Sequence, residues 1–429
     1  MADRDIRELA DLLWQGRLSP AEEPGRSTLF EVAPGMALVT AFGNSIAVKM
    51  RDGLLVVDAS GRRPGPRVVE AIRSWDPSPV RTIILTHGHA DHAGGLAAFD
   101  ADAEARGYPR PHVIAHEKVP ARMDRYARTA GYNTLINIRQ FGRDVLGSGG
   151  TGGDGDRRAA MEAAWRDWRR PDQVYRDELE LEIGEEKFRL RHGMGETDDH
   201  TWVWWASRRC LFPGDLFIWR TPNAGNPQKV QRYPAEWAEA LREMASLGPE
   251  LMVPSHSLPI FGAARIQKAL DETAAVLETI VEQVLALMNR GARLDEVIHS
   301  VRVPDELLSR PYLRPLYDEP EFIVRNIWRL YGGWWDGNAA NLKPAAEAAL
   351  AAELASLAGG AARLAERGEE LAAEGDLRLA CHLVELAGLV EPTDPIVRAA
   401  RAAVYEPRAQ AETSLMSRGI FQAAAREHE

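Results

Sequence analysis

The stretch THGHADHAGG, residues 86–95, constrains the fold of this chain more than any other part of the sequence. It places three histidines and an aspartate within six residues and directly follows VRTIILT, a β-branched run that predicts a strand. The chain has 11 histidines in 429 residues, so random scatter rarely produces such a cluster. Because α/β proteins commonly build their sites on loops at strand ends, the stretch predicts a metal-binding loop there.

The spacing H-x-H-x-D-H favours two metal ions over one. From an extended loop, His87 and His89 can point the same way, while Asp91 and His92 turn toward a second position. Neutral imidazole and carboxylate suit Zn2+, and two zinc ions about 3.5 to 4 Å apart can hold a bridging hydroxide at neutral pH. We therefore expect two Zn2+ ions per chain. The alternative, three histidines around an ordinary surface turn, is disfavoured by further candidate ligands downstream.

Composition limits the chemistry available to this site and its partners. The two cysteines, Cys210 and Cys381, are far apart, which argues against a thiolate site or a disulfide framework. The formal net charge of −11 argues against nucleic acid as the main ligand. The N-terminus is charged throughout, and no window of about 20 uncharged apolar residues occurs. We therefore expect a cytoplasmic protein with neither a membrane nor a nucleic-acid partner.

The pattern of elements changes near residue 262. Before it, short apolar runs such as TLFEVA, MALVTA, SIAVKM and LLVVDA predict strands, with amphipathic helices between and beyond them. This alternation predicts an α/β layered fold. After it, the segment 265–291 carries an apolar helical stripe. The alanine-rich tail from residue 345 predicts helical hairpins of a kind that more often mediates assembly than chemistry.

Together with Asp58 of LLVVDAS, the stretch THGHADHAGG resembles the metallo-β-lactamase superfamily of metal-dependent hydrolases. The resemblance implies an αββα sandwich with a dinuclear site along one edge. It implies that Asp215 of LFPGDLF bridges the two metals and that His256 of VPSHS is the last ligand of the second metal. Asp91 and Asp215 would orient a metal-bound hydroxide for attack on an ester-like bond.

The remaining ligand of the first metal departs from the usual pattern of the superfamily. In place of a Pro-Gly-His-Thr turn the sequence reads GMGETDDH, so Glu196 stands where a histidine is usual. Alkyl sulfatases of the superfamily likewise use glutamate there. We favour Glu196, with His200 as the competing ligand. The full expected set is His87, His89, Asp91, His92, Glu196, Asp215 and His256. The residues expected to support these ligands by hydrogen bonds are Asp58, His116, His192 and His200.

A second resemblance lies in the helical half. The stretch FIVRNIWRLYGGWWDGNAANLKP, residues 322–344, is similar to a characteristic segment of the alkyl sulfatase dimerisation domain. The resemblance implies a homodimer whose helices help to wall the active-site cleft. It divides the chain into an N-terminal helical extension (1–27), a metallo-β-lactamase-like catalytic domain (28–265) and an all-α dimerisation domain (266–429). A C-terminal sterol-carrier-like domain, which large bacterial members add, is not expected.

Substrate contacts are expected from two segments and one aromatic residue. GYNTLINIRQFG, interpreted as a loop on the substrate wall, offers Tyr132, Asn133 and Asn137. Alkyl sulfatases follow the bridging acid with an arginine that grips the sulfate, whereas here the segment NAGNPQKVQRYP offers Lys229 and Arg232. A lysine cannot give the planar two-point grip of a guanidinium. From the helical half, Tyr331 of the segment 322–344 is a further candidate at the cleft edge.

The leading functional hypothesis is a dinuclear zinc hydrolase of an ester-like bond in an apolar or amphipathic small molecule, with an alkyl sulfate as first choice. Two alternatives use the same fold: a lactonase or other carboxyl or thioester hydrolase, and a mononuclear iron dioxygenase. The complete second-metal set argues against the dioxygenase. A non-catalytic dimeric scaffold is disfavoured by candidate ligands at every position, and a nuclease by charge. Five tryptophans are candidates either for a wall around an apolar substrate tail or, the commoner role, for the core: Trp202, Trp204, Trp205, Trp219 and Trp237.

Overall fold

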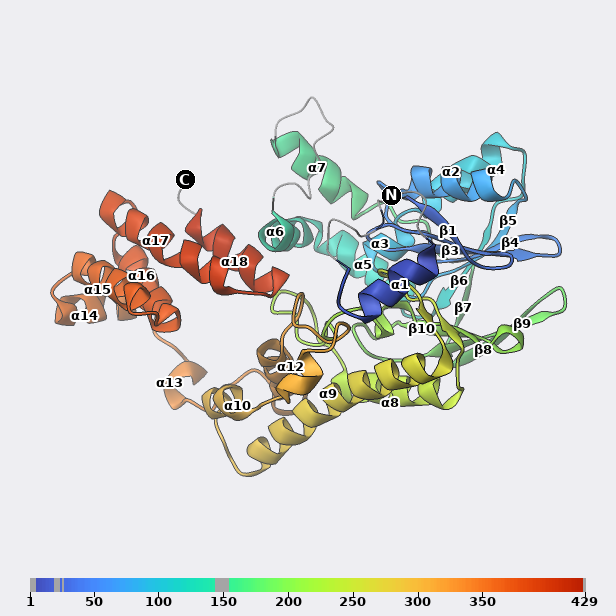
Figure 1. Cartoon of the computed structure of the whole chain (residues 1–429). Coiled ribbons are helices and arrows are strands. Elements are labelled where there is room, and N and C mark those ends of the chain that lie inside the picture. The colour runs from blue at the N-terminus through green and yellow to red at the C-terminus, as the bar shows by residue number, and fades with distance from the viewer. Residues whose placement is uncertain (1–4, 19–23, 25–26, 143–153, 427–429) are drawn as a thin grey trace.

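The chain folds into two β-sheets that lie face to face, with helices on both outer faces (Figure 1). The structure is a computed structural model and describes residues 5–18, 24, 27–142 and 154–426. A helical lobe built from the C-terminal part of the chain lies beside the sandwich (Figure 1). The expected fold class, an αββα sandwich followed by an all-α domain, is confirmed.

The first sheet has seven strands in chain order. They are β1 (Leu29–Ala33), β2 (Met36–Val39), β3 (Ser45–Met50), β4 (Gly53–Val57), β5 (Val80–Ile84), β6 (His112–His116) and β7 (Gln173–Tyr175). Strands β1 to β4 form the expected antiparallel meander, and β4 to β7 pair in parallel. The carboxyl ends of β4 and β5 therefore lie side by side, and the histidine-rich loop begins there.

The second sheet has six strands in the order β13-β12-β11-β10-β9-β8. They are β8 (Glu178–Ile183), β9 (Glu186–His192), β10 (Thr201–Trp205), β11 (Cys210–Phe212), β12 (Leu251–Met252) and β13 (Ile260–Phe261). Only β11 and β12 pair in parallel, so their carboxyl ends also share one edge. In β9, Phe188 and Leu190 are buried while Lys187 and Arg189 are not, which is the period of two expected of a sheet with one packed face.

Helices cover both outer faces of the sandwich. On the first sheet these are α2 (Gly65–Trp75), α4 (Leu96–Ala105) and α5 (Val119–Arg128), which share a core with β4 and β5. On the second sheet they are α8 (Pro234–Ser246), α9 (Ala263–Asn289) and α12 (Pro320–Gly332). The remaining elements of this half are α1 (Ile6–Trp14), α3 (Ala90–Ala93), α6 (Ala130–Phe141), α7 (Asp154–Ala164), and the 3-10 turns η3 (Ala206–Arg208) and η4 (Gly214–Leu216).

One sequence interpretation changes in the structure. GYNTLINIRQFG is not a loop, because it forms most of helix α6. The expected domain boundary between residues 265 and 266 falls inside α9, which packs against α8 and the second sheet, so no linker separates the parts there. The five tryptophans considered for a substrate wall are all buried in core clusters. Trp202, Trp204 and Trp205 lie on β10, which is buried on both faces, whereas Trp219 follows η4 and Trp237 lies on α8.

The helical lobe has a core of its own. The lobe consists of α14 (Glu347–Ala358), α15 (Ala361–Ala373), α16 (Leu377–Val390), α17 (Pro395–Ala411) and α18 (Leu415–Ala425). Helices α10 (Leu294–Ser300) and α11 (Asp305–Leu308) pack instead into the core shared with α8, α9 and α12, and α13 (Ala339–Leu342) precedes the lobe. Helices α14 to α18 pack around alanine, leucine and valine side chains, as the expected hairpins require. Across the part of the chain that is described, no single helix has the length and apolar character to cross a membrane. Helices α14 and α15 have that length and apolar character only when taken together, and the pair is bent by 83°.

Candidate metal centre

Four segments that are distant in the sequence meet at one edge of the sandwich. The histidine-rich loop follows β5, and Glu196 lies a few residues before β10. Asp215 lies in η4, directly after β11, and His256 follows β12. Each segment lies next to a strand of the sandwich core, so the strands fix the position of the side chains.

The side chains of these segments form three overlapping groups whose ligand atoms lie within 4.8 Å of one another. The groups are His87, His92 and Asp215; Asp91, His92 and His256; and His89, Glu196 and Asp215. The structure thus brings together all seven residues that the sequence suggested as metal ligands. Because Asp215 and His92 each belong to two groups, the groups form one continuous cluster rather than separate sites.

The Asp215 carboxylate lies at the centre of this cluster. Its Oδ2 atom is 3.1 Å from Nε2 of His256, 3.5 Å from Nε2 of His92 and 3.8 Å from Nε2 of His87. Oδ2 of Asp91 is 3.5 Å from Nε2 of His256. Metal–ligand bonds of about 2.0 to 2.2 Å in a tetrahedral site place ligand atoms about 3.3 to 3.6 Å apart. The observed separations, 3.1 to 3.8 Å, bracket that spacing.

The protonation preferences of the cluster also fit a cation. Burial lowers the pKa of His87 and of His89 well below its ordinary value, which keeps these imidazoles neutral and able to bind metal. For His92, burial acts to lower the pKa, but the carboxylates of Asp215, Asp91 and Asp58 outweigh it. The net pKa of His92 is therefore well above its usual range. Positive charge is therefore favoured between these carboxylates.

Two buried atoms at the centre lack hydrogen-bond partners among the described residues: Nε2 of His92 and Oδ1 of Asp215. A buried polar atom without a partner is costly and calls for a specific explanation. Nitrogen and oxygen donors of this kind are the ligands that Zn2+ takes in catalytic sites. The residues present therefore fit a metal centre.

Asp58 holds the histidine-rich loop from below. Its carboxylate accepts hydrogen bonds from the backbone N–H and hydroxyl of Thr86, from Nδ1 of His92 (2.9 Å) and from the hydroxyl of Ser255 (2.6 Å). Asp58 is fully buried and has a φ of 59°, a left-handed conformation that few residues other than glycine adopt. This carboxylate fixes the ring orientation of His92 and ties the histidine-rich loop to the segment that carries His256.

Glu196 is held by two side chains of the segment that follows Asp215. Asn223 donates to Oε1 of Glu196, and the Arg232 guanidinium lies 3.3 Å from the same oxygen and also donates to the Glu196 carbonyl. Burial raises the pKa of Glu196 to about 7, although the charge of Arg232 opposes this. Arg232, expected from the sequence to contact substrate, is buried and engaged with Glu196 instead.

The three supporting histidines have different surroundings. His200 lies outside the three ligand groups, and its Nε2 accepts a hydrogen bond from the backbone N–H of Asp215 (3.2 Å). His116 and His192 stack on each other with ring centroids 3.9 Å apart. They bond to the Lys118 backbone N–H and to a backbone carbonyl at position 198, so neither contacts a ligand in a described interaction.

Asp199 and Arg122 also support the centre, and sequence reasoning missed both. The Asp199 carboxylate accepts from the Gly88 backbone N–H (3.0 Å) and from Nε of Arg122 (2.8 Å). Burial alone would raise the pKa of Asp199, but Arg122 and nearby hydrogen bonds bring it to about 2. The pair holds the backbone between His87 and His89. The acidic run ETDDH was the available sign for Asp199, whereas nothing in the sequence distinguishes Arg122 from other arginines.

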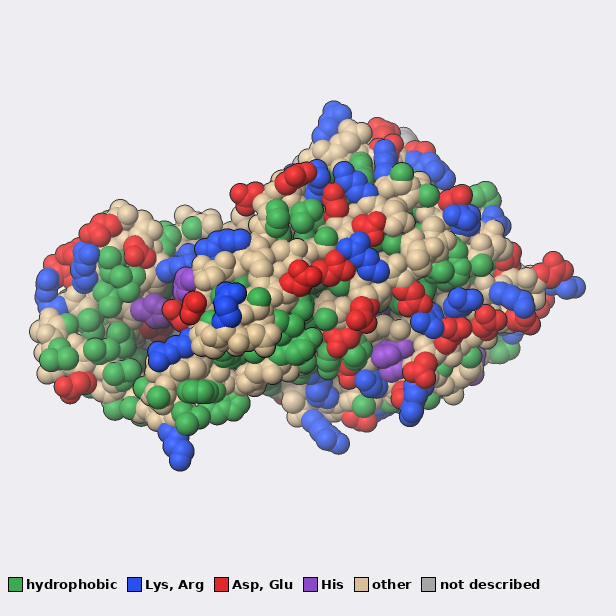
Figure 2. All heavy atoms as spheres, turned by 90° about the horizontal axis from the view of Figure 1, so that it is seen from below, with side chains coloured by type: hydrophobic (Ala, Val, Ile, Leu, Met, Phe, Trp, Pro, Cys, Tyr) green, Lys and Arg blue, Asp and Glu red, His purple; other side chains and the backbone are tan. Residues whose placement is uncertain are grey.

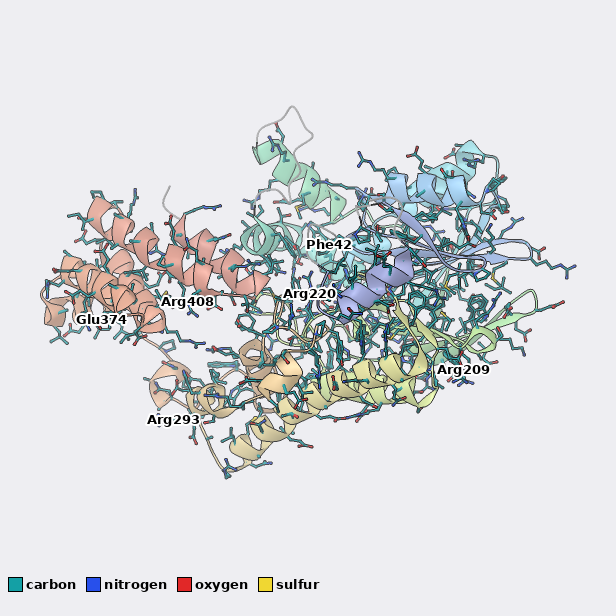
Figure 3. All side chains as sticks on the ribbon, viewed as in Figure 1. Phe42, Arg209, Arg220, Arg293, Glu374 and Arg408 are labelled. Atoms are coloured by element: carbon teal, nitrogen blue, oxygen red, sulfur yellow. The ribbon has the colours of Figure 1, made fainter. Side chains whose placement is uncertain are left out.

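Aromatic side chains stand beside the metal centre. The Phe42 ring lies edge-on to His256, 5.5 Å between centroids, and is 52% exposed. Figure 3 places Phe42 near the middle of the molecule, and its ring contacts Phe141 of α6, which stacks on Tyr317. These three rings, called the aromatic wall below, were not suggested by the sequence because they come from three distant segments.

The expected substrate residues of α6 are arranged differently from one another. Tyr132 is exposed, whereas Asn133 is buried and Asn137 is half-buried. The amide of Asn133 donates to Thr129, and that of Asn137 donates to the Asn133 carbonyl, so both bond within their own part of the chain. Tyr331 lies half-exposed at the end of α12, and no described contact joins it to the ligand groups.

Lys229 lies near the cluster and Arg125 lies near Lys229, and neither has an ion-pair partner among the described residues. Lys229 is half-buried; burial, followed by the charge of Arg232, lowers its pKa to about 8, while Glu196 and Asp91 oppose this. Burial also lowers the pKa of the Arg125 guanidinium, which packs over the Tyr126 ring at 5.1 Å. Lys229 was expected from the sequence; Arg125, on α5, was not.

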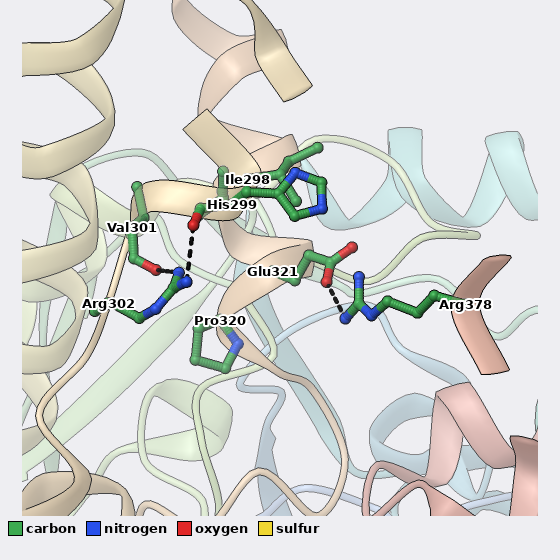
Figure 4. A pocket seen from close by; sticks show the side chains of 8 residues that line it. Ile298, His299, Val301, Arg302, Pro320, Glu321 and Arg378 are labelled. Carbon is green, nitrogen blue, oxygen red and sulfur yellow. Dashed lines mark hydrogen bonds and ion pairs between the residues drawn. The ribbon is translucent and has the colours of Figure 1, made fainter. Parts of the chain in front are cut away.

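A separate cavity of about 310 Å³ lies between α10, α12 and α16 (Figure 4). Its polar groups are already paired: Arg378 forms an ion pair with Glu321 (2.7 Å), and Arg302 donates to the carbonyls of His299 and Val301. None of the residues that line it belongs to the ligand groups. The cavity is therefore distinct from the metal centre.

The αββα sandwich and the histidine and carboxylate cluster at its edge agree with a metal-dependent hydrolase, the class to which the relatives of this chain belong. The profile of the metallo-beta-lactamase superfamily matches residues 39–256, and that of the alkyl sulfatase dimerisation domain matches residues 293–429. The chain belongs to the metallo-beta-lactamase superfamily and carries an alkyl sulfatase dimerisation domain.

The relatives found by sequence are alkyl sulfatases. A linear primary-alkylsulfatase from Pseudomonas sp. is 25% identical over 393 residues, covering 89% of this chain and 73% of its own. An alkyl/aryl-sulfatase from Saccharomyces cerevisiae is 24% identical over 333 residues, covering 74% of this chain and 50% of its own. The structure of the inverting secondary alkylsulfatase Pisa1 from Pseudomonas sp. is similar with a TM-score of 0.77 and 20% identity. That match covers 93% of this chain but 65% of Pisa1, and it bears on the fold alone.

Proposed function

We propose that the protein is a dinuclear zinc enzyme that hydrolyses alkyl sulfate esters. The observation that carries the proposal is the continuous cluster of seven donors in which Asp215 belongs to two ligand groups. His87, His89 and Glu196 would hold one ion and Asp91, His92 and His256 the other, with Asp215 between them. The named relatives act on alkyl sulfates, which sets the first choice of substrate.

When bound, two divalent ions would supply Lewis acidity and an activated water at neutral pH. The chain itself contributes orientation. Asp58 keeps Nε2 of His92 directed into the cluster by bonding to Nδ1 on the other side of the ring. Arg232 and Asn223 hold the Glu196 carboxylate in place, and burial of the cluster excludes bulk water from its base. The residues thus pre-position the donors, so that little reorganisation is needed during the reaction.

The cationic pair fits the sulfate end of such a substrate. Lys229 and Arg125 form no ion pair with a described carboxylate, and burial disfavours the charge of both. An anion placed between them and the cluster would relieve this cost and gain charge-assisted hydrogen bonds. A neutral lactone or thioester would leave both charges uncompensated, so the pair favours the sulfatase over that alternative.

The aromatic wall fits the alkyl end. Because Phe42 is half-exposed next to His256, we expect it to pack on the substrate chain. Replacing Phe42 with alanine should raise the KM for decyl sulfate about 3- to 10-fold but change that for butyl sulfate about twofold or less, since apolar burial scales with contact area. Steady-state kinetics on both esters measures this. Equal effects on the two esters would show that Phe42 does not contact the chain.

The direct test of the function is release of inorganic sulfate from decyl sulfate by zinc-loaded protein. We expect turnover that stops when a chelator removes the metal and returns when zinc is restored. Hydrolysis of a lactone or carboxyl ester without sulfate release would instead support the alternative hydrolase. Metal analysis of the purified protein, with two zinc ions per chain expected, tests the dinuclear part separately.

We also propose that the enzyme is a homodimer. Hydrophobic side chains gather on the helical lobe, at the left of Figure 2, whereas acidic and basic side chains alternate over the sandwich. On α14 the exposed leucines Leu350, Leu354 and Leu357 recur along one side of the helix, and Leu357 is 77% exposed. Exposed apolar patches of this kind mark interaction surfaces, and this one falls within the dimerisation domain.

Charges placed on this leucine stripe should dissociate the dimer. We expect the double substitution Leu350→Asp and Leu357→Asp to convert the protein to a monomer in light scattering coupled to size exclusion, because two desolvated carboxylates in an interface cost several kcal/mol. Val174→Asp, on the exposed edge strand β7, is the matched control and should leave the mass unchanged. A dimer that survives the double substitution would place the interface elsewhere.

A further inference from the structure

The segment between η4 and α8, residues 217–233, contains neither helix nor strand, yet much of it is buried. It carries Asn223 and Arg232, which hold Glu196, and Lys229 of the cationic pair. Buried irregular backbone must find hydrogen-bond partners outside regular structure. The hydrogen-bond partners of this segment therefore fix the position of Lys229.

One set of partners comes from Asp318, which lies two residues before the start of α12. Oδ2 of Asp318 accepts hydrogen bonds from the backbone N–H groups of Gly225 (2.5 Å) and Asn226 (3.2 Å). Its Oδ1 accepts from the backbone N–H of Glu319 (2.8 Å). Asp318 is fully buried, so a single carboxylate joins this segment to the start of α12.

A second set comes from the middle of α12. The side chain of Asn326 pairs with the backbone of Arg232 in both directions, accepting from its N–H (3.2 Å) and donating to its carbonyl (3.0 Å). The same Asn326 oxygen accepts from the side chain of Gln231 (2.9 Å). The amide thus occupies the place that a neighbouring strand would take beside this stretch of backbone.

The contact between the segment and α12 is too close for most side chains. A Cβ atom built on Gly225 would lie 2.2 Å from the backbone carbon of Phe322 and 2.3 Å from the nitrogen of Ile323. Only glycine permits this approach of two backbones. The position of the segment is therefore fixed by α12 on both sides of Lys229, at 225–226 and at 231–232.

We propose that Asp318 and Asn326 are positioning residues for the sulfate-binding side of the centre, acting by holding the segment that presents Lys229. This inference rests on the proposed function for its substrate. It gives α12, which belongs to the part of the chain expected to serve dimerisation, a direct role in substrate binding. Neither residue touches the substrate, and both act through Lys229.

The test uses Asn326→Ala in the full-length, zinc-loaded protein, with Asp318→Asn as a milder second variant. Arg325→Gln, an exposed position on the same helix, is the matched control. We expect amide hydrogen exchange of residues 223–232 to rise at least about tenfold in Asn326→Ala, while exchange of residues 86–95 is unchanged. The KM for decyl sulfate should rise at least about fivefold with kcat within about twofold.

A double-mutant cycle separates positioning from a general structural effect. If Asn326 acts through Lys229, adding Asn326→Ala to Lys229→Ala should raise KM no further. Additive effects, or faster exchange with no change in KM, would overturn the proposal. Unchanged exchange in both variants would overturn it as well. Should the wild-type protein release no sulfate, the proposed function fails, while the exchange measurements still decide whether α12 holds the segment.

Discussion

Replacing Asp215 with alanine is expected to lower kcat/KM for an alkyl sulfate by at least about 10³-fold, because even loss of a supporting residue at a metal site typically costs 10- to 100-fold. Asp215 belongs to two of the three ligand groups, and its Oδ1 has no partner among the described residues. The substitution removes one ligand from each proposed ion. We therefore also expect the zinc content to fall from two ions per chain to one or fewer, measured by plasma mass spectrometry.

The control for this experiment is Asp52→Ala, which removes an exposed carboxylate on the turn between β3 and β4. It should retain full activity and two zinc ions. Circular dichroism checks that Asp215→Ala is folded. An Asp215→Ala protein that keeps both metals and more than about a tenth of the wild-type rate would contradict the central role given to this carboxylate.

The second large effect is expected at Lys229. Lys229→Ala should raise the KM for decyl sulfate about 10- to 100-fold, since a hydrogen bond to a charged group is worth about 1.5 to 3 kcal/mol. Lys229→Arg keeps the charge and should stay within about fivefold of wild type. Binding of inorganic sulfate, measured as competitive inhibition, should weaken in parallel in Lys229→Ala.

The pH dependence of KM gives an independent check on Lys229. Its pKa is lowered to about 8, chiefly by burial, so the cation is lost as the pH rises through about 8. The KM for an alkyl sulfate should therefore increase over that range, and bound metal ions would move the increase to lower pH. Lys229→Arg should remove it, because a guanidinium stays charged. A KM that is flat with pH in the wild-type protein would argue against an ionised Lys229 on the sulfate.

Local sequence patterns predicted an α/β layered fold and a metal-binding loop at the end of a strand, whereas the αββα sandwich was implied by the resemblance to the superfamily. The run of strands up to β5 followed from apolar runs and turn residues, and the spacing His87 to His92 followed from the needs of metal ligands. Asp215 and His256 came only with the resemblance to the superfamily, which supplied their place after strands. The loop predicted over residues 131–142 was wrong because packing against α18, where Gly419 closely approaches the α6 backbone, favours helix.

The sequence by itself determined which residue types could hold metal and that they would follow buried strands, because these depend on spacing and on strand periodicity. Tertiary structure alone decided that Arg232 holds Glu196, that Phe42 stands beside His256, and that Arg125 joins Lys229 near the cluster. The physical reason is that these choices depend on which buried polar and charged groups remain unpaired after folding. That balance is set between segments far apart in the sequence, such as those of Asp58 and Ser255, which are 197 residues apart, and no local pattern records it.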